Sequence, residues 1–286
     1  MNLEKNLKEK RYGFSIRILL TILISIGGLC SLAAGNYFFT DRTDTLTNGI
    51  LTYIIPFTYL FIVYWIIGKF NFDNDNFFKT TNFKLKTFKT FFIGVLCIII
   101  PLVLSFMENV LSFIDKKPLD NFSNILFKLI VLNICIGFFE EGLFRRIILR
   151  SLFKDDSKKS LWIGFLFSSL LFGLIHFGNL SVASQRPIAV TSQVIYAMFL
   201  GMLLSALYLR FKSFIGIMLL HSFIDFISFY PILYGQSTGV TFKNVADITL
   251  IDAVATVGVL IPSAILGVII LISFSKKYYT KYNSQN

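Results

Sequence analysis

Two adjacent carboxylates stand inside an otherwise apolar stretch of the sequence. Glu140 and Glu141 follow Gly-Phe-Phe, and Arg145 comes four residues after the second glutamate. Burying such groups in a bilayer costs several kcal/mol each unless they are paired or serve a site. Glu141 and Arg145 have the i, i+4 spacing that lets side chains pair on a helix. The two glutamates point about 100° apart on a helix, so Glu140 can face a cavity while Arg145 neutralises Glu141.

The chain has two histidines, and both lie in apolar stretches. His176 comes four residues after Phe172, and His221 comes four residues before Asp225, so each pair shares one face of a helix. A cavity lined by these groups and Glu140 would suit the activation of water. Glu140 would take a proton from the water, and His176 would hold or polarise it. His221 with Asp225 would donate to the oxyanion that forms on a peptide carbonyl.

A divalent metal is the alternative way to activate the water. Glu140, His176 and His221 could ligate an ion such as Zn²⁺, which would make the bound water a better nucleophile. The HExxH pattern of helix-borne zinc proteases is absent from the sequence, so the residues do not require a metal. Both forms of the chemistry remain open at this point.

The composition indicates a membrane protein. Of the 286 residues, 55% are hydrophobic, and the mean hydropathy is +0.71. Apolar runs of about 18 to 25 residues are long enough to cross a bilayer. We therefore predict an all-α, polytopic bundle that forms a single membrane domain over residues 1–286, with a catalytic core at approximately 124–234. The eight predicted membrane-spanning helices are 14–39, 49–68, 88–107, 124–150, 161–180, 191–209, 213–234 and 251–274.

The net charge of +11 could suggest a nucleic-acid partner, but the basic residues lie between the spans, and no basic, aromatic-interleaved segment supports one. If the N-terminus is cytoplasmic, most Lys and Arg residues fall on the inner side, in agreement with the positive-inside rule. We expect a multi-pass protein of the cell membrane, with both termini cytoplasmic and the active site open towards the cytoplasm. Arg146 and Arg150 are interpreted as topology signals at the inner surface.

The loop between the fourth and fifth spans places the first two motifs. It is polar, covers residues 154–160, and is predicted to lie at the inner face. The midpoint between Glu140 and His176 falls in this loop, so both lie about 25 Å from the turn of an antiparallel hairpin. His221 lies about two turns into the seventh span. It reaches the same level only if the fourth and fifth helices extend beyond the membrane.

Three motifs together resemble the CPBP family, which comprises CAAX proteases and bacteriocin-processing enzymes and includes the type II CAAX prenyl endopeptidases and the Abi group. The family pattern is EExxxR, then FxxxH, then HxxxN or HxxxD on a later helix. The chain matches it, in order, with Glu140-Glu141 and Arg145, with Phe172 and His176, and with His221 and Asp225. The eight-span count also agrees with the fold of the endopeptidases.

The resemblance implies an intramembrane endopeptidase in which Glu140 is the catalytic base and His176 lies beside the water. It assigns the stabilisation of the intermediate to His221 and Asp225, and a mainly structural role to Glu141 and Arg145. Asp225 replaces the amide of the prenyl endopeptidases. A carboxylate donates a hydrogen bond only when it is protonated, so Asp225 could instead orient or charge His221. Family members have been described both as metalloproteases and as glutamate proteases, which leaves the metal open.

Three functions remain from the sequence. An endopeptidase would act on a membrane-associated peptide or protein substrate. A proton-coupled transporter would use the Glu/His/Asp set as a relay, although no repeated halves with broken helices are evident. A non-catalytic membrane scaffold or bacteriocin-immunity protein would keep the fold and bind a partner. The lipid bilayer is an expected partner in all three cases, whereas the oligomeric state and the substrate stay open.

Overall fold

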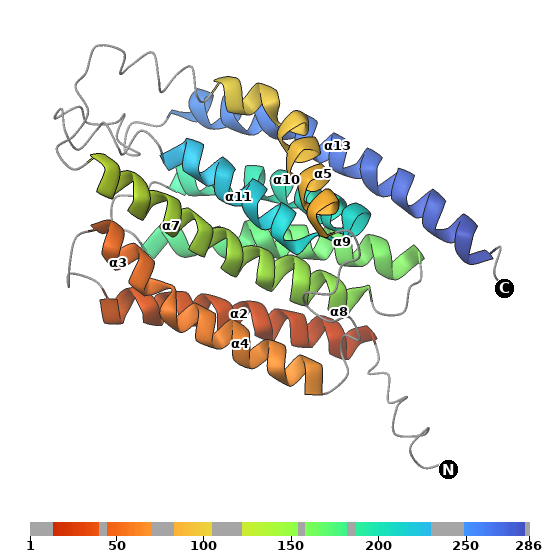
Figure 1. Ribbon diagram of the computed structural model, residues 1–286, viewed down its shortest axis with the longest axis horizontal. Helices are drawn as coiled ribbons and strands as arrows, with labels where there is room; N and C mark the ends of the chain where they lie inside the picture. Colours follow the sequence, from red (N-terminus) through yellow and green to blue (C-terminus); the bar gives the residue numbers. More distant parts are fainter. Residues whose placement is uncertain are drawn as a thin grey trace.

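The apolar runs of the sequence fold into helices, which satisfy every backbone polar group within the segment itself. The computed structural model describes residues 14–39, 45–69, 83–104, 122–153, 158–181, 187–229 and 249–283. Within these ranges the chain is all-helical and contains no strand. Figure 1 shows the long helices packed side by side as a bundle. The predicted all-α class is confirmed.

The helices follow the predicted order along the chain. Their bounds are α2 Phe14–Phe39, α3 Thr45–Thr52, α4 Ile54–Lys69, α5 Phe83–Cys97, α7 Phe122–Glu141, η1 Gly142–Leu149, α8 Arg150–Leu152, α9 Lys158–Leu174, η2 Ile175–Ser181, α10 Pro187–Phe211, α11 Phe214–Phe229 and α13 Leu250–Asn283.

The chain is a multi-pass membrane protein. Six helices in the described part of the chain are long and apolar enough to cross a bilayer: Ser15–Phe39, Leu46–Ile66, Phe122–Leu152, Lys158–Leu180, Pro187–Phe211 and Leu250–Lys277. The other two predicted spans correspond to α5 and to α11, whose apolar part is shorter. The predicted ends at 105–107 and 230–234, the chain termini and loop residues 154–157 lie outside the described residues.

Prolines interrupt two of the predicted spans. The second span is divided at Tyr53 into α3 and α4, three residues before Pro56, and the third has a turn at Ile98, three residues before Pro101. Proline lacks a backbone donor and its ring clashes with the preceding turn, which explains both positions. Pro262, by contrast, lies within the continuous helix α13.

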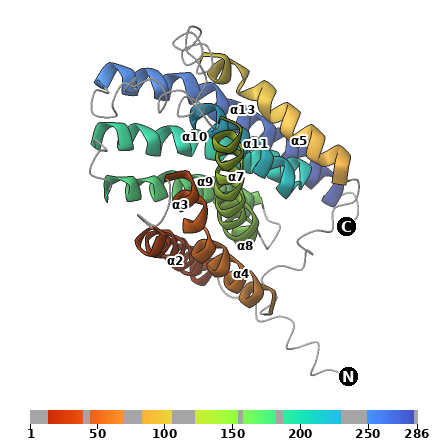
Figure 2. The same ribbon diagram turned by 60° about the vertical axis from the view of Figure 1, so that its left-hand side comes forward.

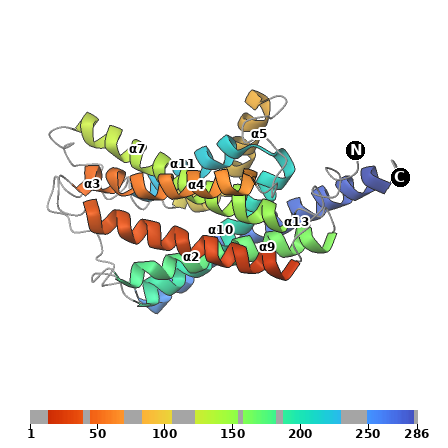
Figure 3. The same cartoon turned by 90° about the horizontal axis from the view of Figure 1, so that it is seen from below.

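The helix formed by α7, η1 and α8 lies at the centre of the bundle. Figures 1 and 2 show α2 and α4 on one side of it, α9 and α10 on another, and α5 and α11 on a third. In the view from below, Figure 3 shows α2, α4 and α7 running lengthwise across the picture, with α5 at a steep angle to them. All eight residues of η1, Gly142–Leu149, are buried. The charged residues of this segment are therefore placed in the protein interior and not against lipid.

Small residues allow α10 to pack closely on α9, as the spacing of Ala197, Gly201 and Ser205 predicts. A Cβ atom added to Gly201 would lie 3.0 Å from the ring of Phe172 and 3.3 Å from the Cα atom of Ser169. The backbones of the two helices therefore approach each other at the level of Phe172.

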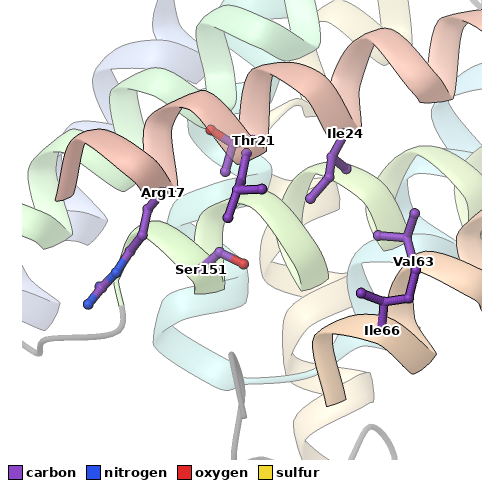
Figure 4. A pocket seen from close by; sticks show the side chains of 7 residues that line it. Arg17, Thr21, Ile24, Val63, Ile66 and Ser151 are labelled. Atoms are coloured by element: carbon purple, nitrogen blue, oxygen red, sulfur yellow. The ribbon is translucent and has the colours of Figure 1, made fainter. Parts of the chain in front are cut away.

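A cavity of about 150 Å³ lies between α2, α4 and α8. Figure 4 shows Thr21, Ile24, Val63 and Ile66 around it, with Ser151 opposite. Its lining combines four aliphatic side chains with those of Arg17, Thr21 and Ser151. None of the predicted site residues lines this cavity, so it is separate from the candidate active site.

Candidate active site

The predicted site residues come from four segments of the bundle. Glu140 and Glu141 end α7, Arg145 lies in η1, His176 lies in η2, and His221 and Asp225 lie one turn apart in α11. The helix continues without a break from α7 into η1, so Glu141 and Arg145 stay one turn apart on the same helix. All of these residues except His176 form one cluster of direct contacts. His176 is linked to the cluster through the ring of Phe172.

Glu141 is the centre of the cluster. Its Oε1 atom lies 2.9 Å from Nη1 of Arg145 and 2.8 Å from Nδ1 of His221. The side chains of Glu141 and Arg145 are both fully buried. The i, i+4 pair that the sequence predicts is thus present. Its carboxylate also holds His221, a contact between residues 80 positions apart.

The second nitrogen of His221 faces two other carboxylates. Its Nε2 atom lies 3.6 Å from Oε2 of Glu140 and 3.5 Å from Oδ2 of Asp225. The side chains of Glu140 and Asp225 are 12% and 21% exposed, whereas that of Glu141 is 0% exposed. The cluster therefore has a closed side at Glu141 and an open side at Glu140 and Asp225.

The contact with Glu141 determines where His221 carries a hydrogen. An ionised carboxylate can only accept, so Nδ1 must donate to Glu141. A neutral ring would then turn the Nε2 lone pair towards Glu140 and Asp225, whereas an imidazolium would turn an N–H group towards them. Separations of 3.5 and 3.6 Å are longer than those of charge-assisted hydrogen bonds. Neither carboxylate therefore holds Nε2 in a short hydrogen bond.

The ring of Phe172 joins the remaining parts of the site. Its centroid lies 4.1 Å from Cζ of Arg145, and the rings of His176 and His221 meet it edge-on at 5.5 and 5.6 Å. A cation over an aromatic face is attracted by the ring quadrupole, more strongly when it is desolvated. Phe172 thus packs against His176, His221 and the guanidinium of Arg145.

His176 is half-buried, and its Nδ1 atom lies 2.9 Å from the carbonyl oxygen of Phe172. Because a carbonyl only accepts, Nδ1 carries the hydrogen of this bond. In the neutral ring, Nε2 is then an acceptor. This is the protonation state that would let His176 accept a hydrogen bond from a water molecule.

Two arginines of η1 are held inside the bundle. Arg145 donates from Nη2 to the carbonyl oxygen of Gly201 at 3.4 Å. Arg146 is 6% exposed, and its Nη1 atom donates to the hydroxyl of Tyr208, also at 3.4 Å. The role of Arg146 as a topology signal stays a prediction, and the structure adds that its guanidinium is packed between helices and contacts the Tyr64 ring.

Close helix packing brings His221 to Glu141. A Cβ atom added to Gly137 would collide with Oγ of Ser222 and lie 2.9 Å from the carbonyl oxygen of Met218. Gly137 lies one turn before Glu141, and Ser222 directly follows His221, so this near-contact of α7 and α11 fixes the pair. The sequence did not reveal the Glu141–His221 contact. Gly137 indicates that another helix approaches α7 closely at this point, but it does not indicate which helix.

A metal held by Glu140, His176 and His221 is the alternative to direct activation of the water. Within the part of the chain that the structure describes, no three His, Cys, Asp or Glu side chains are arranged to hold a metal ion. We therefore derive no chemical step through a metal.

The segment that carries the cluster is similar to a known protein family. Residues 122–227 match the family model described as type II CAAX prenyl endopeptidase Rce1-like. The family resemblance is confirmed. The Rce1-like match covers a little over a third of the chain and includes every residue of the cluster. Neither curated proteins nor solved structures give a match to the chain.

Proposed function

We propose that the protein is an intramembrane endopeptidase that hydrolyses a peptide bond of a membrane-associated peptide or protein. The Rce1-like family is a protease family, which supports a peptide or protein substrate and a membrane-embedded site. The observation that carries the proposal is the cluster around His221. It combines a partly exposed Glu140 with a buried, doubly held Glu141.

Glu140 is the general base in this proposal, and burial supports this choice between the two glutamates. The carboxylate of Glu141 contacts Arg145 and His221 and has no exposed surface, so it cannot reach a substrate. Glu140 is one position earlier on the same helix, and its side chain is partly exposed beside Nε2 of His221. The spacing of the residues alone could not rank the two.

The reaction begins with a water molecule beside Glu140. The carboxylate takes a proton from the water as the water oxygen bonds to the carbonyl carbon of the substrate. The C–N bond then breaks, and Glu140 returns the proton to the leaving amine. His176 accepts a hydrogen bond from the same water through Nε2 and thereby orients it.

His221 stabilises the oxyanion of the tetrahedral intermediate. As an imidazolium it donates from Nε2, while Nδ1 stays bonded to Glu141. A donor directed at the charge that develops in a water-excluded site lowers the barrier. The contact of Asp225 with Nε2 at 3.5 Å supports the second of its two possible roles, to orient and charge His221.

We also propose eight spans, with α5 and α11 added to the six long apolar helices. Both termini are then cytoplasmic, and the site opens towards the cytoplasmic side of the cell membrane. The distribution of Lys and Arg in the sequence supports this orientation.

Glu140→Gln tests the proposed base, because the amide keeps the shape of the side chain and cannot take the proton. We expect a loss of turnover of about 10²-fold or more, while the variant is still inserted and folded. Full biological activity of a Glu140→Gln, His176→Ala protein would contradict the protease proposal and favour the scaffold or immunity function. Adding a chelator to the wild type tests for a divalent metal such as Zn²⁺, since an enzyme without one would be unaffected.

A further inference from the structure

Ser168 on α9 makes a hydrogen bond to the backbone of the neighbouring helix. Its Oγ atom donates to the carbonyl oxygen of Phe144 at 2.8 Å, and both residues are fully buried. A buried serine in a helix commonly bonds to a carbonyl of its own preceding turn instead. Its neighbour Ser169 does so, with Oγ bonded to the carbonyl oxygen of Phe165 at 2.8 Å.

The acceptor belongs to an unusual part of the central helix. Residues Gly142–Leu149 form a π-helix, in which hydrogen bonds join residues i and i+5. Such segments are rare, mostly short, and frequent at functional sites. A change from α to π spacing alters the partners of the backbone carbonyls, and buried carbonyls need partners. Ser168 supplies one for Phe144 from outside the helix.

Phe144 directly precedes Arg145, so its backbone sets the direction of the guanidinium. Arg145 reaches the carboxylate of Glu141 at 2.9 Å and lies over the ring of Phe172. A return of this turn to α spacing would rotate Arg145 relative to Glu141. Because Glu141 also holds His221, the change would reach the proposed oxyanion donor.

Ser168 belongs to one face of α9 that faces η1 and the site. Gly164, Ser168 and Phe172 on α9, and His176 at the start of η2, follow one another at intervals of four residues. A Cβ atom on Gly164 would lie 3.3 Å from the carbonyl oxygen of Leu149, at the end of the π segment. Phe172 packs edge-on against Phe144 and contacts His176. These residues therefore hold α9 close to η1, donate a hydrogen bond to the π turn and contact His176 of the candidate active site.

We propose that Ser168 is a positioning residue of the active site, which holds the π turn of η1 so that Arg145 and Glu141 keep His221 in place. The inference rests on the proposed endopeptidase function. It assigns a role to a residue outside the three motifs, and the role acts through backbone geometry and not through contact with the substrate.

The test compares Ser168→Ala with Ser169→Ala, a matched control in which an equally buried serine loses a bond within its own helix. Both variants, the wild type and Glu140→Gln are reconstituted in phosphatidylethanolamine/phosphatidylglycerol nanodiscs. A quenched fluorescent peptide with a lipid-modified C-terminus serves as the probe. We expect kcat of Ser168→Ala to fall about ten-fold, the factor for one lost hydrogen bond, with KM within about two-fold of wild type. Ser169→Ala should keep both constants.

Wild-type kcat in Ser168→Ala, an equal loss in Ser169→Ala, or a change confined to KM would overturn the positioning role. These results leave the endopeptidase proposal standing if Glu140→Gln is inactive. Absence of turnover in the wild type as well would overturn both. If Ser168→Ala is not recovered folded, Ser168→Cys fills the same space with a weaker donor. Its kcat should then fall below that of the wild type at unchanged KM, and a wild-type kcat would overturn the role.

Discussion

Glu140 and Glu141 are neighbours in the sequence but have different surroundings. Glu141 is enclosed by a buried arginine and a buried histidine, and Glu140 has some exposed surface beside Nε2 of the same histidine. A carboxylate with two fixed partners in the interior is suited to holding them in place. A carboxylate at the open side can meet a water molecule and a substrate.

Glu141→Ala should therefore unfold more easily than Glu140→Ala. Removing Glu141 leaves Arg145 buried without its counter-charge, and breaking a buried pair from one side costs about 3–5 kcal/mol. Thermal unfolding in detergent followed by fluorescence measures the difference. Equal unfolding temperatures for Glu141→Ala and the wild type would show that the pair does not stabilise the fold.

Asp225 is expected to act on His221 by orienting and charging it. Asp225→Asn keeps an oxygen that can accept from Nε2, so we expect it to retain more activity than Asp225→Ala. The alanine variant should lose about ten-fold or more in kcat. Measuring kcat and KM of both variants on one peptide checks this order. Wild-type kcat in Asp225→Ala would contradict the assigned role.

At the scale of elements, the site depends on how closely α7 and α11 approach each other. Gly137 removes a side chain at the point where α7 meets Ser222, next to His221. The broken span at Tyr53 and the π segment at Gly142–Leu149 show that the surrounding helices also depart from regular geometry.

Gly137→Ala should separate α7 from α11 and pull His221 away from Glu141. Overpacking of this kind costs about 1–3 kcal/mol, and we expect kcat to fall together with the unfolding temperature. Gly258→Ala in α13 is the matched control, because a Cβ atom there would meet nothing within 4 Å. Its activity should be unchanged and its stability unchanged or slightly higher, since alanine favours a helix. Similar effects of the two variants would contradict the close-approach argument.

The sequence predicts those parts of the site that depend on spacing within one helix or one hairpin. The i, i+4 interval predicts the Glu141–Arg145 pair, and the polar loop at 154–160 predicts that the fourth and fifth spans are neighbours, which in the structure meet through η1, α8 and α9. It does not predict the sharing of Glu141 with His221, because this contact joins helices 80 residues apart. The sequence does not predict the π turn either, because the hydrogen bond to its Phe144 carbonyl comes from Ser168 on another helix.

At the scale of the whole molecule, the chain is a multi-pass bundle with its polar cluster enclosed by apolar helices. The cluster lies on the central helix, where neighbouring helices and not lipid surround the charges. Ionisable groups are costly in the apolar interior of a membrane unless they have partners or face the interior of the bundle. The position of the cluster meets this requirement.

The proposed orientation predicts the side on which each terminus lies. A C-terminal green fluorescent protein fusion should be fluorescent, and alkaline phosphatase joined after Lys117 in the predicted outer loop should be active. The positive-inside rule is the physical reason, because basic segments stay in the cytoplasm. An inactive phosphatase fusion at Lys117 together with an active one at the C-terminus would reverse the orientation.

The central claim is that Glu140 activates water for peptide-bond hydrolysis. The most direct measurement compares the N- and C-termini of proteins in membranes that contain the wild type or Glu140→Gln at equal abundance, each with and without a chelator. We predict that a defined set of new termini appears with the wild type alone and marks membrane-associated peptides or proteins. Identical sets of termini in the two membranes would contradict the claim.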